Sequence, residues 1–299
     1  MIRRELKGLI VPMITPFNDK GEIDEDGLRQ ITQWLIHSGV NGLFPNSSTG
    51  EMPKMSLDER KRVMKIVVDE ANGKVPVLPG TGDPSTKNTL ELTKYAEDIG
   101  ADGVVIVVPY YFKPDKSSLI EHYKTICSET RIPIMLYNIP QSTGYNLDID
   151  VIVRLVRMKN IFAMKDSSGD MTYFHKILLS TKELKLFQGS EYLLLPSLVI
   201  GASGCVLGMG NICPRLILAL LNAYRDKKLD EALRLQEKLS RGVDIMVRYG
   251  FHTSVKAVLT RMGIGAGFPR QPARILKENE KRKLFSEITD INLLEYEKI

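Results

Sequence analysis

Short apolar runs alternate along the chain with longer segments in which apolar residues recur every three or four positions. The runs are typical of strands buried on both faces, and the longer segments have the period of a helix with one buried face. The predicted strands cover residues 9–15, 42–45, 75–79, 103–108, 134–138, 161–165, 184–188 and 205–207. The predicted helices include 24–37, 57–71, 87–99 and 118–127. The second of these helices follows Ser56 and has Glu59 in its first turn, which is the pattern of a capping box.

Eight strands, each followed by a helix, are the number found in a (β/α)₈ barrel. A doubly wound open sheet is the alternative, but it often carries a glycine-rich loop after its first strand, and no such loop follows Thr15. We therefore predict an α/β protein with a TIM barrel over residues 1–226. A C-terminal helical extension over 227–299 is expected to belong to the same structural unit. The helical segments after the last strand are expected near 213–226, 229–247 and 252–262, followed by a charged tail from residue 276.

Composition narrows the possible functions. The chain of 299 residues is 43% hydrophobic and 26% charged, which is typical of a globular protein. The net charge of +5 comes from scattered residues, without the basic runs of nucleic-acid-binding segments. The apolar stretch 192–209 is interrupted by Pro196 and several glycines, and the N-terminal segment lacks a signal-peptide core. We expect a cytoplasmic protein that acts on small molecules and binds neither nucleic acid nor a membrane.

Lys165 is the first candidate for chemistry, because barrel enzymes carry their sites at the carboxyl ends of the strands. It ends the apolar run 161–164, where a lysine is removed from water. An amine in such surroundings is more readily deprotonated, and the neutral amine can attack a carbonyl carbon to form a Schiff base. The alternative is a lysine that ends a strand and extends its ammonium group into solvent.

Tyr137 ends the preceding strand, which lies beside the Lys165 strand in a sequentially wound barrel. Two polar residues at matching heights on adjacent strands would bring the phenol within reach of the amine. A phenol can transfer protons during imine formation and carbon–carbon cleavage. A core tyrosine with a satisfied hydroxyl is the alternative.

Small hydroxyl residues follow the second strand in the segment 47–51, which reads Ser-Ser-Thr-Gly-Glu. Their hydroxyl and backbone N–H groups are suited to bind a carboxylate. Further candidates are Tyr110 and Tyr111 after the fourth strand and the segment 189–191 after the seventh. Loops of this composition are common, so each segment by itself is a weak signal.

Together these motifs point to a family. They are the opening segment 8–17, Ser-Thr-Gly-Glu at 48–51, Pro-Tyr-Tyr at 109–111, Tyr-Asn-Ile-Pro at 137–140 with Thr-Gly at 143–144, Lys-Asp-Ser-Ser-Gly-Asp at 165–170, and the segment 204–211. In this order they resemble the dihydrodipicolinate synthase/N-acetylneuraminate lyase family. The resemblance extends from about residue 8 to residue 275.

The resemblance implies a pyruvate-handling class I aldolase on a (β/α)₈ barrel, usually a homotetramer. It implies that Lys165 forms the Schiff base with pyruvate or a 2-oxo acid and that Tyr137 is the proton shuttle. Ser48 and Thr49 would hold the pyruvyl carboxylate. Ser48 would also link Tyr137 to Tyr111, which in this family reaches in from a neighbouring subunit.

The resemblance implies neither a metal nor an organic cofactor. The protonated imine itself is the electron sink for the enamine that remains when the C3–C4 bond breaks. The histidines agree with this, since all four are single and scattered. The three cysteines contain no Cys-x-x-Cys pair and indicate neither a disulfide framework nor a zinc ribbon.

Ser142 is a departure from the synthase branch of this family. That branch carries an arginine immediately before Thr-Gly, and the arginine binds the carboxylate of the second substrate. Here a hydroxyl replaces it, a loss of about 2–4 kcal/mol of anchoring if nothing compensates. The departure argues against condensation with aspartate semialdehyde.

The segment after the seventh strand indicates a sugar-acid aldolase. Gly189-Ser190-Glu191 is closer to the Gly-Ser-Asp pattern of those enzymes than to the Gly-Tyr-Asp-Glu pattern of the lyase branch. Ser167, Glu191 and Gly208 would then face the hydroxylated tail of the substrate, and Val206 would line the pyruvate pocket.

Arg248 resembles an arginine that archaeal 2-keto-3-deoxygluconate aldolases use for phosphorylated substrates, and Lys113 could be its partner. A solvated surface position is the alternative for both residues.

The resulting hypothesis is an aldolase that cleaves 2-keto-3-deoxy sugar acids, such as 2-keto-3-deoxygluconate, to pyruvate and an aldehyde. Within the same chemistry, the alternatives are a 4-hydroxy-tetrahydrodipicolinate (dihydrodipicolinate) synthase and an N-acetylneuraminate lyase. From other classes, the alternatives are a catalytically silent barrel that binds a 2-oxo acid and a metal-dependent class II aldolase.

Overall fold

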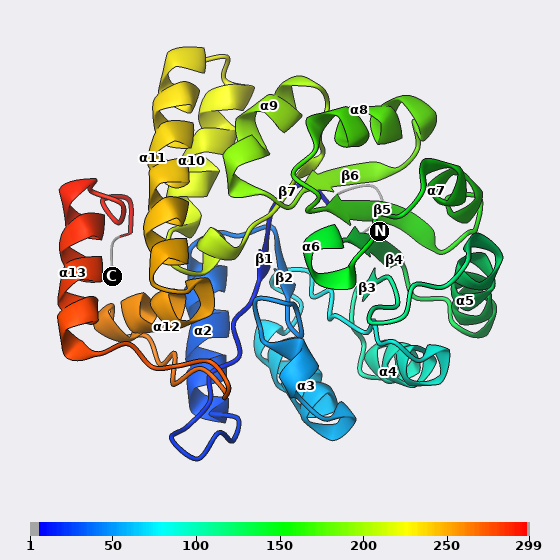
Figure 1. Ribbon diagram of the computed structural model, residues 1–299, viewed down its shortest axis with the longest axis horizontal. Coiled ribbons are helices and arrows are strands. Elements are labelled where there is room, and N and C mark those ends of the chain that lie inside the picture. The colour runs from blue at the N-terminus through cyan, green and yellow to red at the C-terminus, as the bar shows by residue number, and fades with distance from the viewer. Residues whose placement is uncertain (1–5, 298–299) are drawn as a thin grey trace.

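The computed structural model describes residues 6–297, which form a ring of parallel strands surrounded by helices (Figure 1). The strands are β1 (Gly8–Pro12), β2 (Gly42–Phe44), β3 (Val104–Val107), β4 (Ile134–Asn138), β5 (Ile161–Asp166), β6 (Lys185–Gln188) and β7 (Gly204–Val206). The helices are α2 (Glu25–His37), α3 (Leu57–Ala71), α4 (Thr86–Asp98), α5 (Lys116–Glu129), α6 (Pro140–Thr143), α7 (Ile149–Leu155), α8 (Met171–Ser180), α9 (Leu194–Val199), α10 (Pro214–Arg225), α11 (Leu229–Arg248), α12 (Phe251–Arg261) and α13 (Glu278–Asp290). Short 3₁₀ helices follow three of the strands, namely η1 (Met52–Lys54), η2 (Glu191–Leu193) and η3 (Gly208–Asn211).

Hydrogen bonds join the strands of the described range in the order β2-β1-β7-β6-β5-β4-β3. The predicted strand over 75–79 is wrong in detail, because Val77 makes only an isolated bridge to β2 and the isolated bridge to β3 lies at Gly80. Pro76 and Pro79 have no backbone N–H, so this segment cannot form a continuous ladder. The remaining backbone groups of this segment still form hydrogen bonds with β2 and β3, so the ring of strands is nearly closed. The protein is therefore a TIM barrel, as predicted.

Local signals in the sequence set where the helices begin. At α3, the Ser56 hydroxyl accepts from the Glu59 N–H at 3.2 Å, and the Glu59 carboxylate accepts from the Ser56 N–H at 2.9 Å, which confirms the capping box. Each outer helix also turns an apolar stripe inward. In α2, for example, Leu28, Ile31 and Leu35 are buried at spacings of three and four.

The C-terminal helices pack against one side of the barrel (Figure 1). α11 lies along α10, and α12 contacts η3 at the end of β7. The expected division at residue 226 falls in the turn between α10 and α11. The segment from 276, predicted only as a charged tail, contains α13, which buries Leu284 and Ile288. Within residues 6–297, the helices lack the combination of length and apolar character needed to cross a membrane.

Glu297 attaches the C-terminal segment to the start of α10. Its carboxylate accepts from the backbone N–H groups of Arg215 at 2.9 Å and Leu216 at 3.2 Å. A carboxylate is favoured at a helix N-terminus, where N–H groups are otherwise unpaired. Burial nevertheless dominates and raises the pKa of Glu297 to about 7, against the opposing effect of these N–H groups and of Arg215.

We predict that this carboxyl makes the free energy of unfolding depend on pH. In the unfolded chain it loses its proton near pH 4.5, whereas the folded chain keeps the proton up to about pH 7. The stabilisation is therefore complete below pH 4.5 and is lost as the pH rises to about 7, by about 2–3 kcal/mol. Urea unfolding at several pH values would measure it, and Glu297→Gln should remove this part of the slope. An identical slope in the variant would contradict the prediction.

Candidate active site

A cavity of about 250 Å³ opens at the carboxyl ends of the strands. It collects residues that the sequence analysis had placed on separate loops. The predicted site residues in its lining are Ser48, Thr49, Tyr137, Lys165, Ser167, Gly189, Glu191, Val206 and Gly208. The structure therefore brings these residues together around one space.

Lys165 and Tyr137 face each other across the β4–β5 ladder. The two residues are direct partners in the parallel register. The Lys165 Nζ lies 4.1 Å from the centre of the Tyr137 ring and 5.5 Å from that of Phe44. Lys165 is only 3% exposed, so its amine is shielded from bulk water. This geometry holds an amine and a phenol at one height inside the same cavity.

The loop after β2 places Ser48 against the same phenol. The hydroxyls of Ser48 and Tyr137 share a hydrogen bond of 3.2 Å. The turn is held by Ser47, whose hydroxyl donates to the Met13 carbonyl at 3.2 Å and accepts from the Gly50 N–H at 3.0 Å. A Cβ atom at Gly50 would lie 2.7 Å from that Met13 carbonyl, so the close approach of this loop to the end of β1 requires glycine.

A second cavity of about 280 Å³ adjoins the first. The two share Ser48, Tyr137 and Ile139 in their linings. Ser142 lines the second cavity rather than the one that contains Lys165. The phenol and the Ser48 hydroxyl therefore stand between a space next to the amine and a space next to Ser142.

Glu191 supplies a carboxyl group to the Lys165 cavity. It begins η2, and its carboxylate accepts from the Met209 N–H at 3.1 Å. Burial raises the pKa of Glu191, while the N–H of Met209 and the ammonium group of Lys165 act in the opposite direction. The carboxyl is thus held in place at one oxygen and can accept or donate a hydrogen bond at the other.

Asp166 lies next to Lys165 but organises the surrounding loops. It is buried and accepts from the Asn138 side-chain amide at 2.8 Å and from the Ser168 hydroxyl at 2.8 Å. Burial raises its pKa, and these two donors act against that effect. Successive side chains of a strand point to opposite faces, which explains why Lys165 lines the cavity and Asp166 does not.

Tyr111 and Arg248 lie outside the cavity in this chain. Tyr111 has a positive φ of 77° and is 87% exposed. Arg248 pairs with Glu287 of α13. Its neighbour Val247 lines the cavity, and one residue along a helix turns the side chain by about 100°, which carries the guanidinium group away. Lys113, the suggested partner of Arg248, stacks instead over the Tyr145 ring at 5.4 Å.

Several lining residues were missed by the sequence analysis. Phe251 and Val243 of the C-terminal helices line the Lys165 cavity, and His252 lines the second one. They come from a part of the chain that carries no strand, so the rule that selects strand ends could not identify them. Among residues 6–297, no group of three His, Cys, Asp or Glu side chains is arranged to hold a metal ion.

Comparisons with known proteins show to which family the chain belongs. The profile of the Dihydrodipicolinate synthetase family covers residues 5–291. The chain belongs to this family. A 4-hydroxy-tetrahydrodipicolinate synthase of Methanothrix thermoacetophila is 36% identical over 288 residues, which are 96% of this chain and 97% of the relative.

Solved structures of the family have the same fold. A prophage protein of the dihydrodipicolinic acid synthase family from E. coli K12, in complex with pyruvate, has a TM-score of 0.92 at 28% identity over 97% of this chain and 99% of that one. An N-acetylneuraminate lyase from Mycoplasma synoviae has a TM-score of 0.89 at 25% identity over 96% and 98% of the two chains. The resemblance expected from the motifs is thus confirmed, and the protein is a carbon–carbon lyase of the aldolase type.

Proposed function

We propose that this protein is a pyruvate-dependent class I aldolase in which Lys165 forms the Schiff base. The observation that carries the proposal is the shielded amine of Lys165 stacked on the Tyr137 ring, whose hydroxyl is bonded to Ser48. An amine in an enclosed cavity can act as the nucleophile of imine formation, and a phenol beside it can transfer the protons.

The reaction divides among these residues. The neutral amine of Lys165 adds to the C2 carbonyl of a 2-oxo acid, and the adduct takes up one proton and loses water to give a protonated imine; the final hydrolysis returns this proton. When the C3–C4 bond breaks, its electron pair moves into the imine and leaves an enamine, while the C4 hydroxyl loses a proton and becomes the carbonyl of the departing aldehyde. The enamine then takes a proton at C3, and hydrolysis releases pyruvate and the amine. Tyr137 transfers these protons, with Ser48 as its hydrogen-bonding partner.

The pyruvyl carboxylate is assigned to Ser48 and Thr49, which offer hydroxyl and backbone donors beside the amine. Val206 forms an apolar wall of the same cavity. At Gly208 a Cβ atom would lie 2.7 Å from the Phe251 ring, so the close approach of this ring requires a glycine there.

For the second substrate we propose a hydroxylated aldehyde, so that the cleaved compound is a 2-keto-3-deoxy sugar acid. The lining supports this, because Ser167 and Glu191 offer polar groups for hydroxyls. Across residues 6–297, neither cavity is lined by an arginine that could replace the one expected at Ser142. Lys54 lines the second cavity but is paired with Glu51 at 2.7 Å.

The second candidate is condensation of pyruvate with aspartate semialdehyde. The curated relatives favour it over a sugar-acid aldolase, since most of the similar ones are named 4-hydroxy-tetrahydrodipicolinate synthase. The argument from Ser142 stands against it. The neuraminate lyase activity is supported by the structural likeness to the Mycoplasma enzyme.

We also propose that the active assembly is a homotetramer, the state implied by the motif resemblance, in which Tyr111 reaches a neighbouring subunit. Its side chain is 87% exposed and packs edge-to-face on Phe112, which is 80% exposed. Two adjacent exposed aromatic rings are unusual on a free surface and typical of contacts between proteins.

We predict that Lys165→Ala abolishes a covalent adduct with pyruvate, because the attacking nitrogen is gone. Borohydride reduction in the presence of pyruvate, followed by mass spectrometry, measures the adduct. Lys124→Ala, which removes an exposed lysine on α5, should retain it. Catalysis that survives Lys165→Ala would refute the Schiff base, and pyruvate binding to the native chain without an adduct would support a silent binding protein.

We predict that Tyr137→Phe keeps pyruvate binding but lowers turnover by roughly 10²-fold or more, as expected on losing an acid–base group. The phenylalanine ring preserves the packing on Lys165 and Phe44 and removes only the hydroxyl bonded to Ser48. Tyr123→Phe is the matched control, because it deletes a buried hydroxyl bonded to the Ile106 carbonyl away from the cavity. Near-normal turnover of Tyr137→Phe would mean that another group moves the proton.

We predict faster cleavage of 2-keto-3-deoxygluconate or its 6-phosphate than of N-acetylneuraminate, and slow condensation of pyruvate with aspartate semialdehyde. Steady-state kinetics with all four reactions measures the preference. Ser142→Arg should raise the condensation rate, because it restores a bidentate partner for the second carboxylate. Preferred condensation by the native chain would establish the synthase instead.

A further inference from the structure

Glu51 belongs to the Ser-Thr-Gly-Glu motif, but the proposed reaction gives it no role. The residue is 3% exposed and has a positive φ of 60°. One carboxylate oxygen accepts from the Lys256 Nζ at 2.7 Å. The other accepts from the Lys54 Nζ at 2.7 Å and the Arg270 N–H at 3.1 Å. Burial alone would raise the pKa of Glu51, but Lys256 and Lys54 together lower it.

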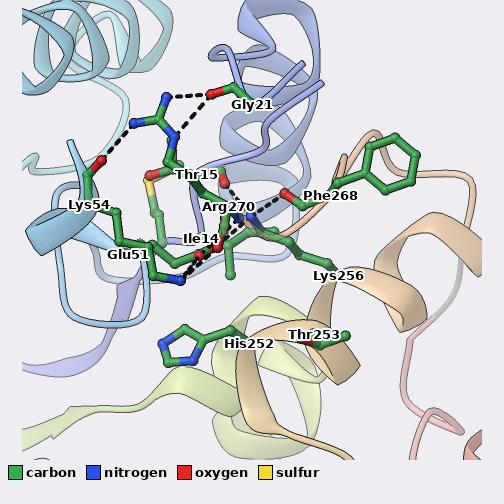
Figure 2. A network of polar contacts seen from close by, with 12 residues as sticks. Ile14, Thr15, Gly21, Glu51, Lys54, His252, Thr253, Lys256, Phe268 and Arg270 are labelled. Atoms are coloured by element: carbon green, nitrogen blue, oxygen red, sulfur yellow. Dashed lines mark hydrogen bonds and ion pairs between the residues drawn. The ribbon is translucent and has the colours of Figure 1, made fainter. Parts of the chain in front are cut away.

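Lys256 comes from α12 and is 1% exposed. Its three N–H donors have three acceptors, namely the carbonyl oxygen of Thr15 at 2.7 Å, Glu51 at 2.7 Å and the carbonyl oxygen of Phe268 at 2.8 Å. Figure 2 shows the ammonium group at the centre of this network. One side chain of the C-terminal helices thus joins the end of β1, the loop after β2 and the segment near 268.

The hydrogen bonds of Glu51 and Lys256 hold the loop that carries Ser48. Ser47 fixes one end of the turn to Met13, and Glu51 fixes the other end to Lys256. Between them, the Ser48 carbonyl accepts from the His252 Nε2 at 3.1 Å. His252 and Lys256 are four residues apart and so lie on one face of α12. The same helix face therefore holds the loop at two points.

A buried ion pair is weak evidence for stability, because removing two charges from water costs about as much as their attraction returns. The need to hold a catalytic group in a defined position explains a buried ion pair better than stability does. A catalytic group must be held to within about 0.5 Å of its working position, and its supporting contacts set that tolerance. Ser48 is such a group, since its hydroxyl meets the Tyr137 phenol at 3.2 Å.

We propose that Lys256 is a positioning residue, which acts through Glu51 to hold Ser48 and Thr49 against Tyr137 and the pyruvyl carboxylate. The inference rests on the proposed function for its catalytic consequence. The C-terminal helix α12 is then part of the catalytic apparatus and not only a cover for the barrel.

The test uses Lys256→Met and the double variant Lys256→Met/Glu51→Gln. The double variant removes both charges together and keeps the test open if the single variant fails to fold. Glu297→Gln is the matched control, because it alters a buried carboxylate at the start of α10, away from the loop. Two quantities are measured for each full-length protein: kinetics with pyruvate, and amide hydrogen exchange of the segments 46–52 and 134–138.

We expect both Lys256 variants to raise the KM for pyruvate at least tenfold and to lower turnover per adduct-forming site at least tenfold. Exchange in 46–52 should rise at least tenfold, while exchange in 134–138 stays as in the control. A lowered melting temperature with unchanged KM, turnover per site and loop exchange would show a merely structural role and overturn the inference.

The two proposals fail in different ways. If the native chain forms no adduct with pyruvate, the proposed function is wrong, and the exchange measurement alone decides whether Lys256 holds the loop. If the native chain forms the adduct and the variants behave like the control, the positioning role is wrong and the aldolase chemistry remains.

Discussion

The parallel hydrogen-bond ladder between β4 and β5 is the constraint on which the site depends. It pairs Tyr137 with Lys165 and so places the phenol and the amine at one height. Because side chains alternate between the two faces of a strand, a slip of one residue would turn Lys165 out of the cavity and bring Asp166 into it. Every residue of β5 is buried in the present register, and Asp166 accepts hydrogen bonds from Asn138 and Ser168 there, so a slip would break these bonds.

A second level of organisation comes from outside the barrel. The residues that face the amine lie at strand ends, and side chains from the C-terminal helices contact the loop that carries Ser48. Lys256 enters from α12 and binds the loop after β2, and Phe251 of the same helix closes the cavity beside Gly208. The strand ends carry the candidate catalytic groups, and α12 binds the loop after β2 at two points.

The two adjoining cavities share Ser48, Tyr137 and Ile139 in their linings. Tyr137 and Ser48 stand where the cavities meet, and Lys165 lines only the first cavity; the proposed function assigns the aldolase chemistry to these three residues. The groups that we propose to contact the rest of the substrate, such as Glu191 in the first cavity and Ser142 in the second, lie on the segments after β6 and β4. One scaffold can therefore serve synthases and lyases, and a high TM-score to both kinds of enzyme does not select between them.

The sequence by itself determined the fold class, because buried strands and amphipathic helices leave periodic patterns that a local reading can detect. It also determined that Lys165, Tyr137 and Ser48 converge, since strand ends meet at one edge of a barrel. It did not show that the segment 75–79 makes only an isolated bridge. In that segment the apolar pattern of a strand is present, but two prolines remove the donors that a ladder needs.

Only the tertiary structure decided which distant residues complete the site. The contact between Glu51 and Lys256 joins positions 205 residues apart, and no periodicity or spacing encodes such a pair. Arg248 was placed near the substrate by motif likeness, yet the rotation of α11 turns it toward Glu287. Local sequence sets which element a residue joins and which face it occupies. The packing of elements against each other sets what that face meets.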